Sequence, residues 1–163
     1  MALCETVKLE HVDDHVLDLV INLNRIPQIN TLTTCEGHVP YEPPTWPAKD
    51  GWIYFTIPEG AYRDLLLTLE LFCQERNYFA LRNIRSVKPM IESFQIVAEY
   101  EPHHDAEMNN LFEKMNDAGK KAYFERAEIR RKEILQGWSD LNALVVQYIQ
   151  AHIAEDIESL PYR

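Results

Sequence analysis

The sequence contains no long apolar run, which argues against a membrane-spanning helix. No window of its 163 residues approaches the ~18 uninterrupted apolar residues that such a helix needs. Residues 1–8 also lack a basic stretch followed by an apolar one, so we expect no secretory signal. No internal repeat, low-complexity tract or linker divides the sequence. We therefore expect a single domain over residues 1–163 that has no membrane partner.

Cysteine is too scarce to support a disulfide framework. The sequence has three cysteines, Cys4, Cys35 and Cys73, an odd number without the spacing of a disulfide scaffold. The domain is also long enough to bury a core without disulfides or metal staples. Together these facts predict free thiols in a reducing cytoplasm.

Positive charge is scarce as well. There are 16 Lys and Arg residues against 26 Asp and Glu residues, and the net charge is −10. A nucleic-acid-binding protein normally carries a basic stripe, because neutralised phosphates supply much of its affinity. The densest basic region, 114–132, is interleaved with acidic residues and is typical of a solvated helix face. Duplex nucleic acid is therefore an unlikely partner, whereas a local site for one nucleotide or an RNA end stays open.

The hydrophobic pattern alternates between helix and strand periods. A helical stripe over 12–24 carries Asp13 and Asp14, which suit a first turn. Strands are predicted at 29–34, at 52–57, which is apolar enough to be central, and at 78–87 and 90–100, which form an antiparallel pair. Residues 58–77 hold a second helix, with Cys73 on its buried side. This order predicts an α+β fold, a mixed α/β sandwich with a small, largely antiparallel sheet and packed helices.

Residues 105–163 are predicted to be entirely helical. We expect a break near 116–119, a charged helix that ends at Gly137, and a last helix capped by Ser139 or Asp140. The apolar stripe of that last helix predicts either packing on the sheet or a homo-oligomer formed through the C-terminal helices. In the second case the protein is a non-enzymatic interaction module whose C-terminal helices bind a partner.

The chemically capable residues gather in one short stretch, Thr33-Thr34-Cys35-Glu36-Gly37-His38. Gly37 permits a turn in which backbone N–H groups converge on an anion, and Thr33 and Thr34 add hydroxyl donors. The imidazole of His38 is suited to move a proton near neutral pH. We therefore predict a small-ligand site, for an anion or a nucleotide-like molecule, with His38, Cys35 and Glu36 as candidate catalytic groups. The alternative is a purely structural glycine turn.

The segment 39–51 that follows is rich in proline. Four of the nine prolines of the sequence lie here, which excludes a helix or a central strand. So long a loop commonly covers or lines a site. Tyr41 and Trp46 are therefore candidate ligand-binding residues, as a lid or a stacking wall, unless they merely pack beside the loop.

The stretch 33–38 resembles the Thr-Thr-Ser-Ser-Cys-Ser-Gly-Arg signature of the wybutosine-synthesising tRNA methyltransferases that act third in that pathway. The resemblance implies a nucleoside-modifying enzyme that uses S-adenosylmethionine, with Thr34, Cys35 and Gly37 at its site. Two positions depart from the signature, since Glu36 replaces a small residue and His38 replaces the arginine. The Cys-Glu-Gly-His form also resembles a motif of small uncharacterised bacterial and phage proteins.

Two further chemistries fit the same residues. Cys35-x-x-His38 has the spacing of half a zinc site, and His103 and His104 would complete it if the strands before Cys35 and His103 run in the same direction. Such a donor set suits zinc or another borderline transition metal. Alternatively, Cys35 and His38 act as nucleophile and base in hydrolysis or acyl transfer, although the sequence reveals no third group to orient them.

Overall fold

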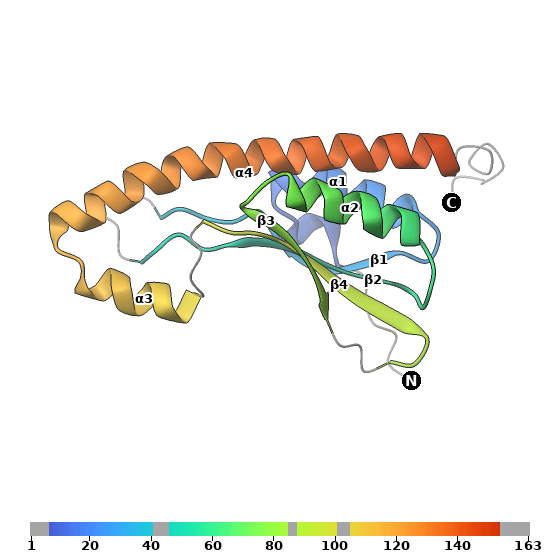
Figure 1. Ribbon diagram of the computed structural model, residues 1–163, viewed down its shortest axis with the longest axis horizontal. Coiled ribbons are helices and arrows are strands. Elements are labelled where there is room, and N and C mark those ends of the chain that lie inside the picture. The colour runs from blue at the N-terminus through green and yellow to red at the C-terminus, as the bar shows by residue number, and fades with distance from the viewer. Residues whose placement is uncertain (1–6, 41–45, 85–87, 101–104, 154–163) are drawn as a thin grey trace.

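The structure is a computed structural model, which describes residues 7–40, 46–84, 88–100 and 105–153. It confirms the α+β class: four antiparallel strands in the order β1-β2-β4-β3 carry helices on one face (Figure 1). The strands are β1 (Asn30–Cys35), β2 (Gly51–Pro58), β3 (Phe79–Ile84) and β4 (Ile91–Ala98). The helices are α1 (Asp14–Arg25), α2 (Arg63–Gln74), α3 (Asp105–Lys114) and α4 (Asp117–His152), and a short 3-10 helix, η1 (Leu9–His11), precedes α1.

The register of the two central strands explains which face of the sheet is buried. Ile53 pairs with Ile96 and Phe55 with Phe94, and all four side chains are buried. Residues directly opposite each other in an antiparallel pair point to the same face. This face packs under α1, α2 and α4, whose apolar stripes complete the core (Figure 1). The expected central position of 52–57 is thus confirmed.

β1 and β4 run in the same direction, because each is antiparallel to β2 between them. Their carboxyl ends therefore meet one edge of the sheet, where Cys35 pairs with Trp52 and Trp52 with Val97. This is the geometry that the pairing of Cys35 with His103 and His104 requires. Those two histidines themselves lie outside the described residues.

The helical region is organised differently from the expectation. Gly137 does not end a helix, and neither Ser139 nor Asp140 begins one, because α4 continues through all three residues. A Cβ on Gly137 would lie 2.4 Å from the ring of Phe79, so the glycine is required for a close approach of α4 to β3. Tertiary packing here overrides the local tendency of glycine to end helices. Within the described residues, no helix has the length and apolar character needed to cross a membrane.

The described ends of the proline-rich segment are held in place. The N–H of His38 donates to the carbonyl of Lys49 (3.0 Å), and the N–H of Lys49 donates back to the carbonyl of His38 (2.8 Å). The N–H of Ala48 donates to the hydroxyl of Tyr123 near the start of α4 (2.9 Å). The loop therefore closes at its base directly beside the Cys35–His38 turn.

Gly137→Ala should lower the free energy of unfolding by about 1–3 kcal/mol, the usual cost of overpacking a core. The reason is the contact of the new methyl group with the Phe79 ring. Urea unfolding followed by circular dichroism measures the change. Gly119→Ala in the same helix is the matched control, since its Cβ meets nothing closer than Asn116 Oδ1 at 3.2 Å, and it should shift stability by less than about 1 kcal/mol. A Gly137→Ala protein as stable as the wild type would contradict the packing role.

Candidate functional site

The Cys35–His38 turn fits tightly against the start of β2. Gly37 has a positive φ of 92°, and a Cβ there would lie 3.0 Å from both Gly51 N and the Tyr100 ring. A Cβ on Gly51 would lie 2.5 Å from the carbonyl oxygen of Glu36. Both glycines are therefore required, one for its backbone conformation and both for space. The turn is therefore packed closely against the start of β2.

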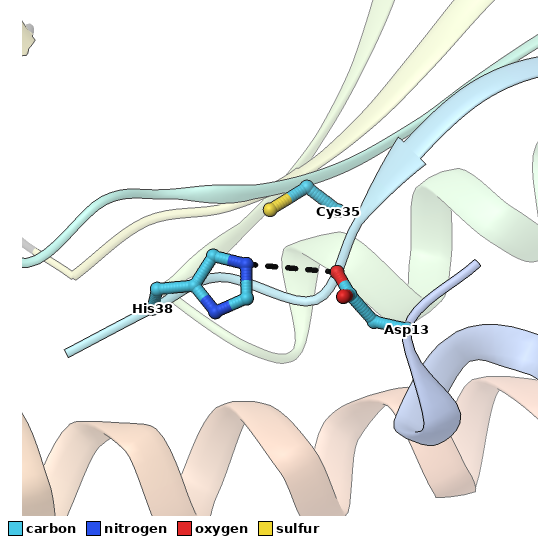
Figure 2. A group of neighbouring side chains, drawn as sticks. All are labelled: Asp13, Cys35 and His38. Atoms are coloured by element: carbon cyan, nitrogen blue, oxygen red, sulfur yellow. Dashed lines mark ion pairs between the residues drawn. The ribbon is translucent and has the colours of Figure 1, made fainter. Parts of the chain in front are cut away.

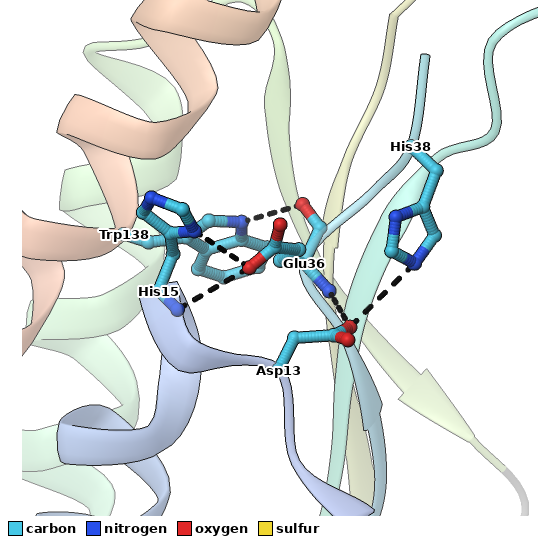
Figure 3. Close-up of polar contacts among 5 residues, drawn as sticks. All are labelled: Asp13, His15, Glu36, His38 and Trp138. Atoms are coloured by element: carbon cyan, nitrogen blue, oxygen red, sulfur yellow. Dashed lines mark hydrogen bonds and ion pairs between the residues drawn. The ribbon is translucent and has the colours of Figure 1, made fainter. Parts of the chain in front are cut away.

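The carboxylates of Asp13 and Glu36 each accept a backbone hydrogen bond across the junction of α1 and β1 (Figure 3). The N–H of Glu36 donates to Asp13 Oδ2 (2.9 Å). In return, His15 in the first turn of α1 donates to Glu36 Oε2 from its backbone N–H (3.2 Å) and from Nδ1 (2.8 Å). A carboxylate at a helix N-terminus satisfies an otherwise unpaired amide and interacts favourably with the helix dipole. The two segments are thus joined through both backbones.

Trp138 holds the same turn from α4. Its indole N–H donates to the carbonyl of Glu36 (3.1 Å), and the side chain is fully buried. Glu36 itself is only 8% exposed. Its carboxylate points toward His15, on the opposite side from His38 (Figure 3). The structure therefore gives Glu36, a candidate catalytic group in the sequence, a place beside α1 rather than in front of His38.

Three potential ligand atoms converge next to the turn (Figure 2). One atom each from Asp13, Cys35 and His38 lie within 4.8 Å of one another, and His38 Nε2 is 3.6 Å from Asp13 Oδ2. Asp13 was expected in the first turn of α1, but it is the residue before that turn, and its carboxylate makes no capping bond to its own helix. No local pattern distinguishes such an aspartate from an ordinary cap, which is why the sequence did not identify it.

The electrostatic surroundings of Cys35 disfavour a free thiolate. Burial raises the pKa of the Cys35 thiol, and the charge of Asp13, a hydrogen bond to its carboxylate and the charge of Glu36 raise it further. A hydrogen bond from the Gly37 backbone acts in the opposite direction but is outweighed. Asp13 does supply the third group that a Cys35–His38 pair lacked in the sequence. Yet a cysteine nucleophile needs a lowered pKa, so this environment does not favour that mechanism.

Comparisons of the chain with protein-family models, with curated proteins and with solved structures find no match. The resemblance to the wybutosine-pathway methyltransferases, and with it S-adenosylmethionine, stays a prediction. Function is accordingly inferred from the donor atoms of the site and their geometry.

The backbone amides expected to cradle an anion are already engaged. The N–H of Glu36 binds Asp13, that of Gly37 binds the sulfur of Cys35, and that of His38 binds the Lys49 carbonyl. An anion at this turn would have to displace a carboxylate of the protein itself. The three turn amides are therefore not free to bind an anion in this arrangement.

The other candidate residues lie around the turn rather than within the cluster. Thr33 is exposed, and the hydroxyl of Thr34 is buried without a hydrogen-bond partner. Trp46 is 37% exposed with the ammonium of Lys49 5.6 Å from its ring centre. Tyr41, His103 and His104 lie outside the described residues.

Alkylation by iodoacetamide in the presence of a chelator should modify Cys35 and spare Cys73. Cys35 is half-buried, whereas Cys73 is buried and its pKa is raised to about 12, chiefly by burial. Asp13→Asn should speed modification of Cys35 several-fold, because losing the negative charge lowers the thiol pKa and increases the thiolate fraction at a given pH.

Peptide mapping by mass spectrometry measures both rates and keeps Cys4 separate. Asp14→Asn is the control, since this neighbouring carboxylate is exposed and does not act on Cys35. Equal rates for Cys35 and Cys73, or an unchanged rate in Asp13→Asn, would contradict the described environment.

Proposed function

We propose that this protein binds a zinc-type divalent metal ion at Asp13, Cys35 and His38. The observation that carries the proposal is the convergence of a carboxylate oxygen, a thiol sulfur and an imidazole nitrogen from two segments of the chain. The segments are the residue before α1 and the end of β1 with the turn that follows it, and the hydrogen bonds between Asp13, His15 and Glu36 hold them together. Clusters of carboxylates alone are common on protein surfaces without a metal. A set that combines oxygen, sulfur and nitrogen donors is a more specific indication of a transition-metal site.

The spacing of the three atoms supports a tetrahedral site. Ligands bound to zinc at 2.0–2.3 Å lie about 3.3–3.8 Å from one another. The 3.6 Å between His38 Nε2 and Asp13 Oδ2 is slightly longer than the ~3.3–3.5 Å expected for a nitrogen and an oxygen ligand. Since all three atoms lie within 4.8 Å of one another, only a small inward adjustment would place them around one ion.

The charges of the donor set also suit a divalent cation. Coordination deprotonates a thiol outright, so the ion would reverse the raised pKa of Cys35. A carboxylate and a thiolate would then balance two positive charges beside a neutral imidazole. The backbone N–H of Glu36, which donates to Asp13, would orient that ligand from the next shell of contacts.

Three protein ligands leave one position of a tetrahedral ion open. Catalytic zinc sites with three protein ligands hold water there and lower its pKa toward neutrality, which makes the water a nucleophile. We therefore propose metal-assisted hydrolysis as the reaction class. If His103 or His104 supplies the fourth ligand instead, the site is closed and structural.

Trp46 is exposed and lies beside Lys49, which supports a small molecule as the substrate. The backbone of Lys49 pairs with that of His38, and we propose that the Trp46 ring and the Lys49 ammonium would contact an anionic or nucleotide-like molecule bound at the metal. This assignment retains the small-ligand site expected from the sequence, while the ion takes the central place that the turn amides were expected to have.

Titration of metal-free protein with Co²⁺ should show one ion per chain and a thiolate-to-cobalt charge-transfer absorption. Cys35→Ser should abolish that absorption, and Asp13→Ala and His38→Ala should each weaken binding at least tenfold, since each removes a ligand. His103→Ala and His104→Ala separate an open site from a closed one.

His11→Ala is the matched control, because His11 is an exposed histidine close in sequence to Asp13 but outside the cluster. It should leave the affinity unchanged. The metal proposal fails if the wild type binds no Co²⁺ or Zn²⁺ below millimolar concentration, or if the Cys35→Ser protein binds as tightly as the wild type.

A further inference from the structure

We propose that Glu36 is a positioning residue for the metal site, acting through the first turn of α1 to hold Asp13 in its ligand position. This inference rests on the proposed metal site. The carboxylate of Glu36 points away from His38 and does not reach the ion (Figure 3). Its effect on the site is indirect, through the hydrogen bonds that decide where the Asp13 side chain lies.

Asp13 occupies a position from which aspartate normally caps its own helix. An N-cap aspartate accepts a hydrogen bond from the backbone N–H two or three residues later, which here includes His15. The backbone of Asp13 has the extended conformation of an N-cap (φ −62°, ψ 143°), yet its side chain makes no such bond. The backbone conformation would allow Asp13 to cap α1, but its side chain does not form the capping hydrogen bond.

The reason is that both amides within its reach are occupied: the N–H three residues later donates to the carbonyl of Asp13 itself (3.1 Å), and the N–H of His15 donates to Glu36. The N–H of His15 donates to Glu36 Oε2 at 3.2 Å, and the His15 ring donates to the same oxygen at 2.8 Å. Glu36 thus caps α1 from another part of the chain. The Asp13 carboxylate is released toward the Glu36 N–H and toward the cluster with Cys35 and His38.

Glu36 is itself held firmly enough to act in this way. Its side chain is only 10% exposed, and its carbonyl accepts the indole N–H of the fully buried Trp138. Without an acceptor at position 36, the His15 amide would be free for Asp13, and capping its own helix would draw Asp13 out of the metal site. The two uses of Asp13 compete, and Glu36 decides between them.

The test compares two substitutions that remove the same charge. Glu36→Gln keeps an oxygen that accepts the His15 amide, whereas Glu36→Met has a similar length and no oxygen acceptor. The electrostatic loss is common to both, so their difference reports positioning. We expect Glu36→Met to bind Zn²⁺ about 10–100-fold more weakly than Glu36→Gln, the usual range for an outer-shell partner. Calorimetric titration well below the unfolding temperature measures both affinities.

Glu92→Met is the stability-matched control. Glu92 also satisfies a backbone amide, that of Gly60 at 3.1 Å, but it belongs to β4 and lies outside the metal cluster. This variant should lose stability and keep the wild-type zinc affinity. A double-mutant cycle gives the second readout: in an Asp13→Ala background, Glu36→Met and Glu36→Gln should bind zinc equally, because the residue through which position 36 acts is gone.

The outcomes separate this inference from the metal proposal. A wild type that binds no metal removes both. A wild type that binds zinc, with equal affinities for Glu36→Met and Glu36→Gln, overturns the positioning role alone. Should Glu36→Met fail to fold, His15→Ala replaces it, since this half-exposed side chain donates one of the two bonds to Glu36. It should weaken zinc binding several-fold, and an unchanged affinity would overturn the inference.

Discussion

A reciprocal pair of hydrogen bonds joins the start of α1 to the residue after β1, and the site depends on this constraint: Asp13 accepts from the Glu36 amide, and Glu36 accepts from the His15 amide. Each carboxylate satisfies a backbone amide of the opposite segment: Asp13 that of the residue after β1, and Glu36 that of the first turn of α1. Unpaired amides at such places are costly when they are removed from water. The two bonds therefore fix how α1 meets the end of β1. Cys35 precedes Glu36 and His38 follows it by two residues, so the same contact that secures the fold brings Asp13 to both.

The long helix α4 completes this arrangement from above the sheet. Gly137 lets α4 approach the Phe79 ring, and the next residue, Trp138, stacks edge-on against that ring with centres 4.8 Å apart. From this position the Trp138 indole reaches the Glu36 carbonyl. Gly137 thus allows the close approach of α4 to the sheet, and Trp138 uses that approach to bind the turn. The same position of α4 therefore determines both the core packing and the geometry of the turn.

A feature of the fold or of the site could be predicted from the sequence where the interaction that determines it is between residues close together in the chain. The strands at 52–57 and 94–98 could be predicted because apolar residues line the face of the sheet that meets the helices, although the burial of Val97 on the opposite face breaks the expected alternation. The turn with Cys35 and His38 could be predicted as a candidate site because its combination of residue types is unusual. The predicted helix end at Gly137 was wrong because the glycine is required by its contact with the Phe79 ring, 58 positions earlier in the chain. Asp13 was missed because its hydrogen-bond partner, Glu36, comes 23 residues later. Local rules assign both residues sensible but different roles.

Stability alone does not explain why a carboxylate stands at position 13. An asparagine there would satisfy the Glu36 amide equally well and would not place a negative charge beside Cys35 and Glu36. The present arrangement raises the pKa of the thiol and gathers acidic groups at a half-buried turn in a protein whose net charge is already −10. Like charges at short range oppose folding unless something compensates them. In the proposed site a bound cation would interact favourably with the Asp13 carboxylate and the Cys35 thiolate, so the charge pattern supports the metal proposal together with the positions of the donor atoms.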